Sequence, residues 1–548
     1  MLAPNCTSFF AIALLVVRVF SEDPVVVTGI RTGILTSGQR PLRFDIKDLQ
    51  ATGGPLWPYI PWNDIGQGDG CPKVGFCPHG EVPFASWHRP YLALFEQALG
   101  DHVKSIASQY TGEDSDQYTK AAQVFRIPYW DWATDAKLPP ATTSPNITVN
   151  GPEGKMEVRN PLYSFYWPTY PLNDNPDWFP GAGAGGDANI WNHTNTQRLI
   201  NGDNSASDLQ LNVDELRDKV YATFTKSSTF ETMASSQTHG SSFEDPHNMI
   251  HNSAGVTMQP PEYSAFDPIF WLHHCNVDRL LALWQAKYYK NTYQTEPSNS
   301  TSGTYTVRRG SLVNGENPLM PFYLDNRRNF HTGVTMASTK GFGYTYPGID
   351  DWSMSAEETS QNVTALVKRL YGSDGASLLK RSGPQRMGRA SWKEYYVQIG
   401  VERAELECPC TISVLLGDKV AGSMALLSMP TMGRAYSEVP LTRPISQLTS
   451  CLEEKTVIPF LQQRFRVEIR KCAPTPSCKA SSLEPDLRVT IADIIVAQDD
   501  NTQIPVELVP SLTIDMYSED VEDSGPDNFP THGIPQFWPN IGRPARKL

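Results

Sequence analysis

The sequence predicts a mainly α-helical region over residues 25–349, followed by an all-β, sandwich-like domain over residues 391–548. Three observations support this fold class. The chain has 548 residues, more than a single hydrophobic core usually serves. Apolar residues recur at helical spacing in the first region, whereas short runs in the second alternate between apolar and polar residues. We therefore expect two folded parts, joined by a helix and a linker over residues 350–390.

Three segments carry the clearest helical signals. From Trp87 to Leu99, apolar residues recur every three or four positions. Asp267 is a suitable N-cap and precedes Pro268, a residue favoured at the first helical position, at the start of DPIFWLHHCNVDRLLALWQ. Ser355 and Glu358 have the spacing of a capping box, which predicts a helix over residues 355–371.

The carboxyl-terminal region has the pattern of antiparallel strands. Alternating runs between turn signals, which predict a sandwich, are EYYVQIGVERAEL, CTISVLLG, RFRVEIRK and LRVTIADIIVA. The segment LLKRSGPQRMGR before them is basic and poorly periodic, which indicates an exposed linker. Within it, Lys380-Arg381 has the form of a dibasic processing site, although a solvated basic pair is also common in linkers.

The composition limits the classes of partner. The formal charge of −13 argues against nucleic acid and against an anionic membrane surface. The apolar run at residues 8–17 is too short to span a bilayer, so no membrane span is expected. Residues 1–21 are a candidate signal peptide, which predicts a secreted or cell-wall-associated protein; if they form a buried segment instead, we expect a cytoplasmic one. Secretion is compatible with sequons at Asn146, Asn192, Asn299 and Asn362.

The nine cysteines are too sparse for a disulfide scaffold. Cys472 and Cys478 flank a proline-rich turn and could pair with each other. Cys408 and Cys410 are separated by one residue and could hold a soft metal instead. Spacing alone does not choose between these uses.

Three histidines have the spacing of a transition-metal site. His247 and His251 are four residues apart, so on a helix both rings project from one face, although surface helices also produce such pairs by chance. His274 lies on the helix capped by Asp267 and shares its inward stripe, whereas His273 points about 100° away. We therefore interpret His274 as a third nitrogen ligand and His273 as a residue that orients a neighbour. All-imidazole sites suit Zn, Cu, Fe or Ni, so the metal stays open.

Five motifs, taken together, resemble the type-3 copper family and are similar to fungal tyrosinases in particular. In this sequence they read CPHG, WHRPYLALFEQAL, PYWDWA, PHNMIH and DPIFWLHHCNVDRL. The resemblance implies a tyrosinase-like four-helix bundle around a dicopper site, with O2 as cosubstrate. It also implies oxidation of small phenols, both monophenols and o-diphenols, to o-quinones, and formation of melanin-type pigment.

The resemblance also assigns ligands to the two copper ions. His247, His251 and His274 correspond to the second copper, and His79 and His88 to two of the three ligands of the first. Cys77 corresponds to the cysteine that forms a thioether to the histidine two residues later in fungal members. The alternative for Cys77 is a disulfide with Cys71.

Two polar residues next to the ligands match catalytic positions of the family. Glu244 matches the carboxylate that holds a water near the site, and Asn248 matches the amide that helps to orient this water. A phenol has a pKa near ~10 and must lose its proton to approach copper. With both residues present, we expect monophenolase as well as diphenolase activity. The alternatives are a helix-terminal carboxylate and a surface amide. We expect the apolar wall from Phe266 and Phe270, with the residues near Ser264.

The first copper lacks one of its expected ligands. Fungal tyrosinases place this histidine upstream of a PYIPW run, which is present here as Pro58–Trp62, but residues 1–78 contain no histidine. The resemblance therefore implies that a segment of roughly thirty residues, and with it one bundle helix of ~15–20 residues, is missing at the Trp57–Pro58 junction. His102 does not replace it, because it lies about 21 Å along the helix from His88. A gene-model error is one explanation, and sequencing the transcript tests it.

Several functions remain open from the sequence. The main expectation is tyrosinase-type oxidation; the alternatives are a catechol oxidase without monophenolase activity, or a copper-deficient product that loads the second site at best and is inactive on phenols. A hemocyanin-like oxygen carrier and a zinc hydrolase are rivals from other classes. Gly343–Tyr346 resembles the tyrosine motif that closes the family's core domain near residue 349. We also expect the carboxyl-terminal domain to cover the active site until proteolysis at the linker.

Overall fold

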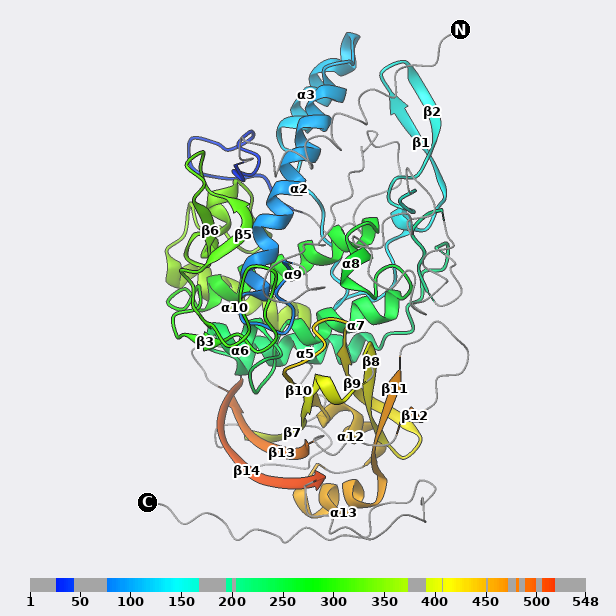
Figure 1. Ribbon diagram of the computed structural model, residues 1–548, viewed down its shortest axis with the longest axis vertical. Coiled ribbons are helices and arrows are strands. Elements are labelled where there is room, and N and C mark those ends of the chain that lie inside the picture. Colours follow the sequence, from blue (N-terminus) through cyan, green and yellow to red (C-terminus); the bar gives the residue numbers. More distant parts are fainter. Residues whose placement is uncertain are drawn as a thin grey trace.

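The computed structural model describes most of both predicted regions. The described residues are 26–43, 76–166, 194–199, 204–372, 391–406, 408–449, 452–471, 480–481, 488–498 and 505–517. Several predictions lie outside them: the candidate signal peptide, the Trp57–Pro58 junction, the Lys380-Arg381 site, the sequon at Asn192 and the pairing of Cys472 with Cys478. Figure 1 shows the helical region above and the β-rich domain below, so the predicted fold class is confirmed.

The helical region is built around the buried helix α9. The helices in this region are α2 (Phe84–Ala107), α3 (Ser115–Gln123), α5 (Val213–Lys226), α6 (Phe230–Ala234), α7 (Glu244–Ala254), α8 (Pro261–Ser264), α9 (Pro268–Lys287) and α10 (Ala356–Tyr371). Helix α9 contacts α2, α7 and α10. Its polar and apolar residues are buried from Pro268 to Gln285, because neighbouring elements cover it on every side.

The helical region also contains short pairs of antiparallel strands. They are β1 (Asn146–Gly151) with β2 (Gly154–Arg159), β3 (Ser298–Asn299) with β4 (Leu312–Val313), and β5 (Pro318–Tyr323) with β6 (Phe330–Thr332). None of the helices within the described residues is long and apolar enough to cross a membrane.

The predicted helix starts are confirmed. The Asp267 carboxylate accepts a hydrogen bond from the Ile269 N–H at 3.0 Å, and Arg198 pairs with it at 2.7 Å where both side chains are fully buried. At α10, the Ser355 hydroxyl and the Glu358 carboxylate form the complete capping box. Helix α2 runs beyond the predicted Leu99. Gly100 lies within this helix, at a position where a Cβ atom would meet Ile30 Cδ1 at 2.5 Å.

Asp278, one turn beyond His274 on α9, joins distant parts of the chain. Its carboxylate accepts hydrogen bonds from Arg89 at 2.6 Å, from Arg43 at 3.1 Å, and from the hydroxyls of Tyr344 and Tyr346 at 2.6 Å each. All five side chains are buried. The tyrosines of the Gly343–Tyr346 segment therefore tie the end of the helical region to the helix that carries His274.

The carboxyl-terminal domain is an antiparallel sandwich, as predicted. One sheet has the order β10-β7-β13-β14, with β7 (Ser391–Glu402), β10 (Arg434–Pro440), β13 (Arg488–Gln498) and β14 (Pro505–Tyr517). The other has the order β12-β11-β8-β9, with β8 (Cys410–Leu416), β9 (Lys419–Leu426), β11 (Phe465–Lys471) and β12 (Ala480–Ser481). Helices α12 (Thr442–Leu448) and α13 (Glu454–Arg464) accompany them. Val397 and Ile399 of the first sheet share one core with Ile412 and Val414 of the second.

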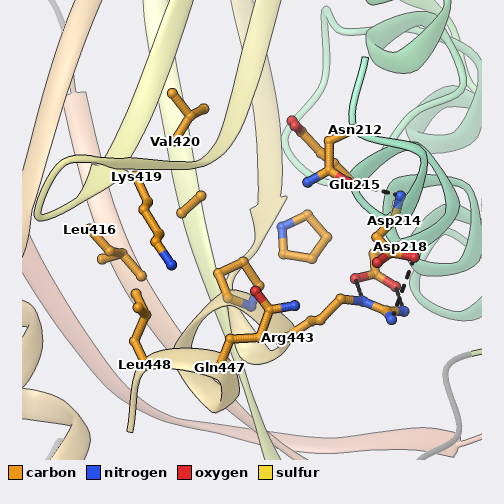
Figure 2. A pocket seen from close by; sticks show the side chains of 13 residues that line it. Asn212, Asp214, Glu215, Asp218, Leu416, Lys419, Val420, Arg443, Gln447 and Leu448 are labelled. Carbon is orange, nitrogen blue, oxygen red and sulfur yellow. Dashed lines mark hydrogen bonds and ion pairs between the residues drawn. The ribbon is translucent and has the colours of Figure 1, made fainter. Parts of the chain in front are cut away.

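The sandwich packs directly on the helices that carry the histidines. Strand β9 lies against α7 (Figure 1). An ion pair crosses the contact between Lys226 and Glu438 at 2.6 Å, with 11% and 6% of the two side chains exposed. Beside α5, a pocket of about 240 Å³ lies between the two parts. Figure 2 shows Arg443 of α12 reaching across it to Asp218 at 2.7 Å.

Candidate metal centre

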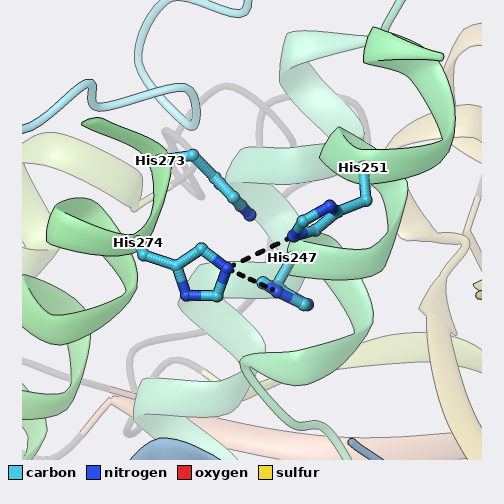
Figure 3. A group of neighbouring side chains, drawn as sticks. All are labelled: His247, His251, His273 and His274. Atoms are coloured by element: carbon cyan, nitrogen blue, oxygen red, sulfur yellow. Dashed lines mark hydrogen bonds between the residues drawn. The ribbon is translucent and has the colours of Figure 1, made fainter. Parts of the chain in front are cut away.

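Three predicted ligands converge in the core. His247 and His251 project from α7 and His274 from α9, all three with at most 1% of their surface exposed. Nε2 of His274 lies 3.3 Å from Nε2 of His247 and 3.3 Å from Nε2 of His251 (Figure 3). The Nδ1 atoms of the two α7 histidines are held by hydrogen bonds. His247 Nδ1 donates to Asn248 Oδ1 at 2.9 Å, and His251 Nδ1 donates to the Met258 carbonyl at 2.6 Å. These bonds leave the Nε2 lone pairs of His247 and His251 for a shared ion.

The spacing and the protonation state both fit a transition metal. A tetrahedral ion bound at 2.0–2.1 Å would separate two nitrogen ligands by about 3.3–3.4 Å, which matches the observed 3.3 Å. Burial lowers the pKa of His251 to about 4 and lowers the pKa of His247 and His274 well below the ordinary value. The rings are therefore neutral at neutral pH, as metal ligands must be.

His273 lies in the same cluster, contrary to the expectation that it points away. Its ring stacks on His247 at 4.9 Å, and Figure 3 shows it directed towards His251. Among the described residues neither of its ring nitrogens has a hydrogen-bond partner. The helical rotation of 100° was correct, but α7 crosses α9 so closely that both consecutive rings reach it. His273 thus packs against the ligands and makes no bond that would orient one.

A second group of metal-binding side chains lies on α2 and the loop before it. Cys77, His79 and His88 place their ligand atoms within 4.8 Å of one another. Both histidines are buried, and Nδ1 of His88 donates to the Phe84 carbonyl at 2.8 Å. The ring of His88 stacks on His274 at 4.4 Å, and the ring of His79 stacks on His247 at 5.6 Å. The five predicted histidines therefore form two adjoining groups, and His102 is in neither.

The loop that carries Cys77 and His79 is held by two carboxylates. The Gly80 N–H donates to Glu244 at 2.5 Å. One oxygen of Glu81 accepts from the backbone N–H groups of Thr301, Ser302 and Gly303. Successive amides of this kind form a concave anion site, here filled by the protein's own side chain. The loop is thus held at two consecutive residues, Gly80 through its backbone N–H and Glu81 through its side chain.

The two predicted catalytic residues lie beside the histidines but also make structural contacts. Glu244 is fully buried; its second oxygen accepts from Ser235 and Ser236, and burial raises its pKa. The Asn248 amide is buried, and its N–H group donates to the Ala425 carbonyl of β9 at 3.3 Å. Their action on a water molecule stays a prediction.

The predicted apolar wall is present in part. The Phe270 ring lies 4.1 Å from the His274 ring, so it lines the cluster directly. Phe266 stacks instead on Phe165 at 5.7 Å, and the Ser264 hydroxyl donates to the Pro261 carbonyl. Phe270 is therefore the wall residue nearest to a ligand ring.

Arg403 is a residue of this site that the sequence did not reveal. It comes from the β sandwich, is 2% exposed, and donates to the Ser236 hydroxyl at 3.1 Å. Its guanidinium rests on Gly80, where a Cβ atom would meet Nη1 at 2.4 Å. No local pattern could have indicated it, because more than 300 residues separate it from Gly80.

Comparison with known proteins agrees with this geometry. Residues 50–287 match a family model described as the common central domain of tyrosinase. A tyrosinase of Podospora anserina is 30% identical over 403 residues, which is 64% of this chain and 69% of the relative. The chain belongs to the tyrosinase family.

Two further matches extend the likeness. Polyphenol oxidase 2 of Agaricus bisporus is 32% identical over 324 residues, 56% of each chain, so the match spans only about half of that relative. A structure of latent and active mushroom tyrosinase superposes with a TM-score of 0.72 and 21% identity, covering 90% of this chain and 98% of the other. The family implies a dicopper site. His247, His251 and His274 fit the share of one copper with three imidazoles, whereas the group on α2 and the loop before it offers two histidines and Cys77.

Proposed function

We propose that this protein oxidises small phenols, both monophenols and o-diphenols, to o-quinones with O2 at a dicopper centre. The observation that carries the proposal is the convergence of His247, His251 and His274 at 3.3 Å, directly against the buried His79 and His88. The resulting o-quinones would feed formation of melanin-type pigment. Bound copper would supply the activation of O2.

The chain's own residues would position the substrate and handle its proton. Phe270 offers an aromatic face beside His274, against which a flat phenol can stack. Glu244 and Asn248 would hold a water that accepts the phenolic proton, and Asn248 also fixes the tautomer of His247. The burial of all these groups keeps bulk water from the reacting ring.

Metal analysis and oxygen uptake test the proposal. The full chain is reconstituted with copper, and O2 consumption is measured with a monophenol and with an o-diphenol. His251→Ala removes a ligand, so it should lower the rate of O2 consumption by more than the roughly 10–100-fold that changes to residues outside the ligand set cause. His102→Ala is the matched control, because it removes an imidazole of α2 outside both groups. Zinc without copper in the chain as isolated, or copper bound after reconstitution without phenol-dependent O2 uptake, would contradict the proposal.

The carboxyl-terminal domain would limit access to this site. Support comes from Arg403 resting on Gly80 and from the Asn248 bond to Ala425, both contacts of the sandwich with residues beside ligands. Cleavage at Lys380-Arg381 should then raise the activity towards bulky diphenols. Equal activity before and after cleavage would contradict the covering role. Secretion and the thioether between Cys77 and His79 remain predictions; peptide mapping of the secreted chain tests both.

One observation favours a second candidate. Since residues 1–78 contain no histidine, the first copper lacks an expected imidazole, and the chain would then be a copper-deficient product without activity on phenols. The copper content separates the candidates: two ions per chain support the oxidase, and one ion per chain supports the deficient product. A catechol oxidase would show two ions and react with o-diphenols alone.

A further inference from the structure

A short segment, residues 197–199, connects the two helices that carry the three converging histidines, and we call this segment the brace. The Leu199 N–H donates to the Ala254 carbonyl at the end of α7 at 2.7 Å. The fully buried side chain of Arg198 pairs with Asp267, the N-cap of α9, at 2.7 Å. The brace is thus bonded to the end of one ligand-bearing helix and to the start of the other.

The turn that follows α7 has an unfavourable backbone conformation. Val256 has φ = 36°, and Leu199 of the brace has φ = 56°. The two segments lie side by side, since a Cβ atom on Gly255 would meet the backbone of Leu199 at 3.6 Å. A positive φ is rare for a β-branched or bulky residue, because its Cβ atom crowds the backbone. Such conformations persist only where the surrounding contacts impose them.

The brace supplies contacts that hold this turn. The Gln197 N–H donates to the Thr257 hydroxyl at 2.9 Å, and the Thr257 N–H donates to the Gln197 carbonyl at 3.1 Å. Thr257 is only 2% exposed, so water does not replace these partners. The next residue, Met258, offers the carbonyl that accepts from His251 Nδ1 at 2.6 Å. The reciprocal pair therefore holds the strained turn next to the group that orients a ligand ring.

We infer that Thr257 and the brace are positioning elements of the metal centre. They hold the strained turn so that the Met258 carbonyl keeps His251 in the tautomer that offers Nε2 to an ion. Without the Thr257 hydroxyl, Val256 would relax towards negative φ and turn the carbonyl away from the ring. Loss of a partner that orients a ligand typically lowers metal affinity by about 10–100-fold. The inference rests on the proposed function only in taking these histidines as a metal centre.

Cobalt titration of the metal-free full chain tests this inference without phenol or O2, so a failure of the oxidase activity would leave its result unchanged. Four-coordinate Co(II) absorbs strongly in the visible range, and the ion that His251→Ala fails to bind identifies the relevant site. Thr257→Val keeps the size of the side chain but removes the hydroxyl, and it should lower the affinity for this ion by about tenfold or more. Thr257→Ser keeps the hydroxyl and should bind the ion as tightly as the unchanged chain.

Two further variants separate positioning from general stability. Glycine adopts positive φ readily. Val256→Gly added to Thr257→Val should therefore let the turn keep its conformation without the hydroxyl and recover most of the lost affinity. Ser355→Ala is the control for destabilisation, because it weakens the cap of α10 and removes no contact of the brace. It should lower the unfolding midpoint without changing the affinity for Co(II).

Each other outcome would overturn the inference. If Thr257→Val lowers the unfolding midpoint but binds Co(II) with unchanged affinity, Thr257 serves the fold alone. If the double variant binds no better than Thr257→Val, strain in the turn is not what moves the carbonyl. An equal loss of affinity in Ser355→Ala would show that the effect follows stability. An unchanged chain that binds no Co(II) through His251 would show that the turn positions no metal ligand.

Discussion

Replacing Asp278 by Asn should destabilise the helical region more than removing a tyrosine hydroxyl that binds this carboxylate. The Asp278 carboxylate is buried and receives Arg43, Arg89 and the two tyrosine hydroxyls. Asn keeps the shape but leaves the buried guanidinium of Arg89 without its anion, whereas Arg43 keeps its buried ion pair with Glu96 at 3.0 Å. Breaking a buried ion pair by removing one partner costs about 3–5 kcal/mol. The matched variant Tyr344→Phe removes one hydrogen bond to a charged group and should cost about 1.5–3 kcal/mol.

Calorimetry of the metal-free chain distinguishes these two effects. One kcal/mol shifts the midpoint of a domain of about 150–250 residues by about 2–4 °C, and the lower value suits a larger region. Asp278→Asn should therefore lower the unfolding midpoint by about 6–10 °C and Tyr344→Phe by about 3–6 °C. If Asp278→Asn shifts the midpoint less than Tyr344→Phe, the carboxylate does not hold these parts together and the reasoning is wrong.

Further predictions concern the pH dependence, the amide, the cap and the domain contact. His251 has a pKa lowered to about 4, below its unfolded value of 6.5, so its contribution to the stability of the metal-free chain should be complete above pH ~6.5 and fall by about 3 kcal/mol as the pH falls to ~4. Other buried histidines such as His88, whose pKa is lowered to about 3, add to this loss; urea unfolding at several pH values measures it, and no loss would contradict the reasoning. Asn248→Ala should slow monophenol oxidation more than o-diphenol oxidation, and equal losses would argue against its role with the water. Ser355→Ala should lower the free energy of unfolding, measured with a denaturant, by about 1 kcal/mol; a change near zero would mean that the capping box does not stabilise the chain. Gly80→Ala should displace Arg403 and speed proteolytic release of the sandwich; unchanged digestion would show that the contact does not matter.

Local chemistry explains why the fold and the second ligand group were predictable. The helix starts at Asp267 and Ser355 depend on residues two or three positions away, and both appear in the structure as expected. The spacing of His247 and His251 places both rings on one face of a helix, whatever surrounds it. In the last third of the chain, the alternation of apolar and polar residues predicted antiparallel strands, because this pattern also depends only on neighbouring residues.

Only the tertiary structure decided how the site is held. Neither the contact of Glu244 with Gly80 nor that of Asn248 with Ala425 follows from spacing, because each joins residues more than 100 positions apart. The position of His273 depended on how closely α7 crosses α9, and a helical wheel contains no information about a neighbouring helix. The sequence alone established that residues 1–78 contain no histidine, because composition is read directly from the sequence. That Cys77 lies between the two remaining imidazoles became visible only when the loop was seen packed against α2, because a loop without periodicity does not fix the direction of its side chains.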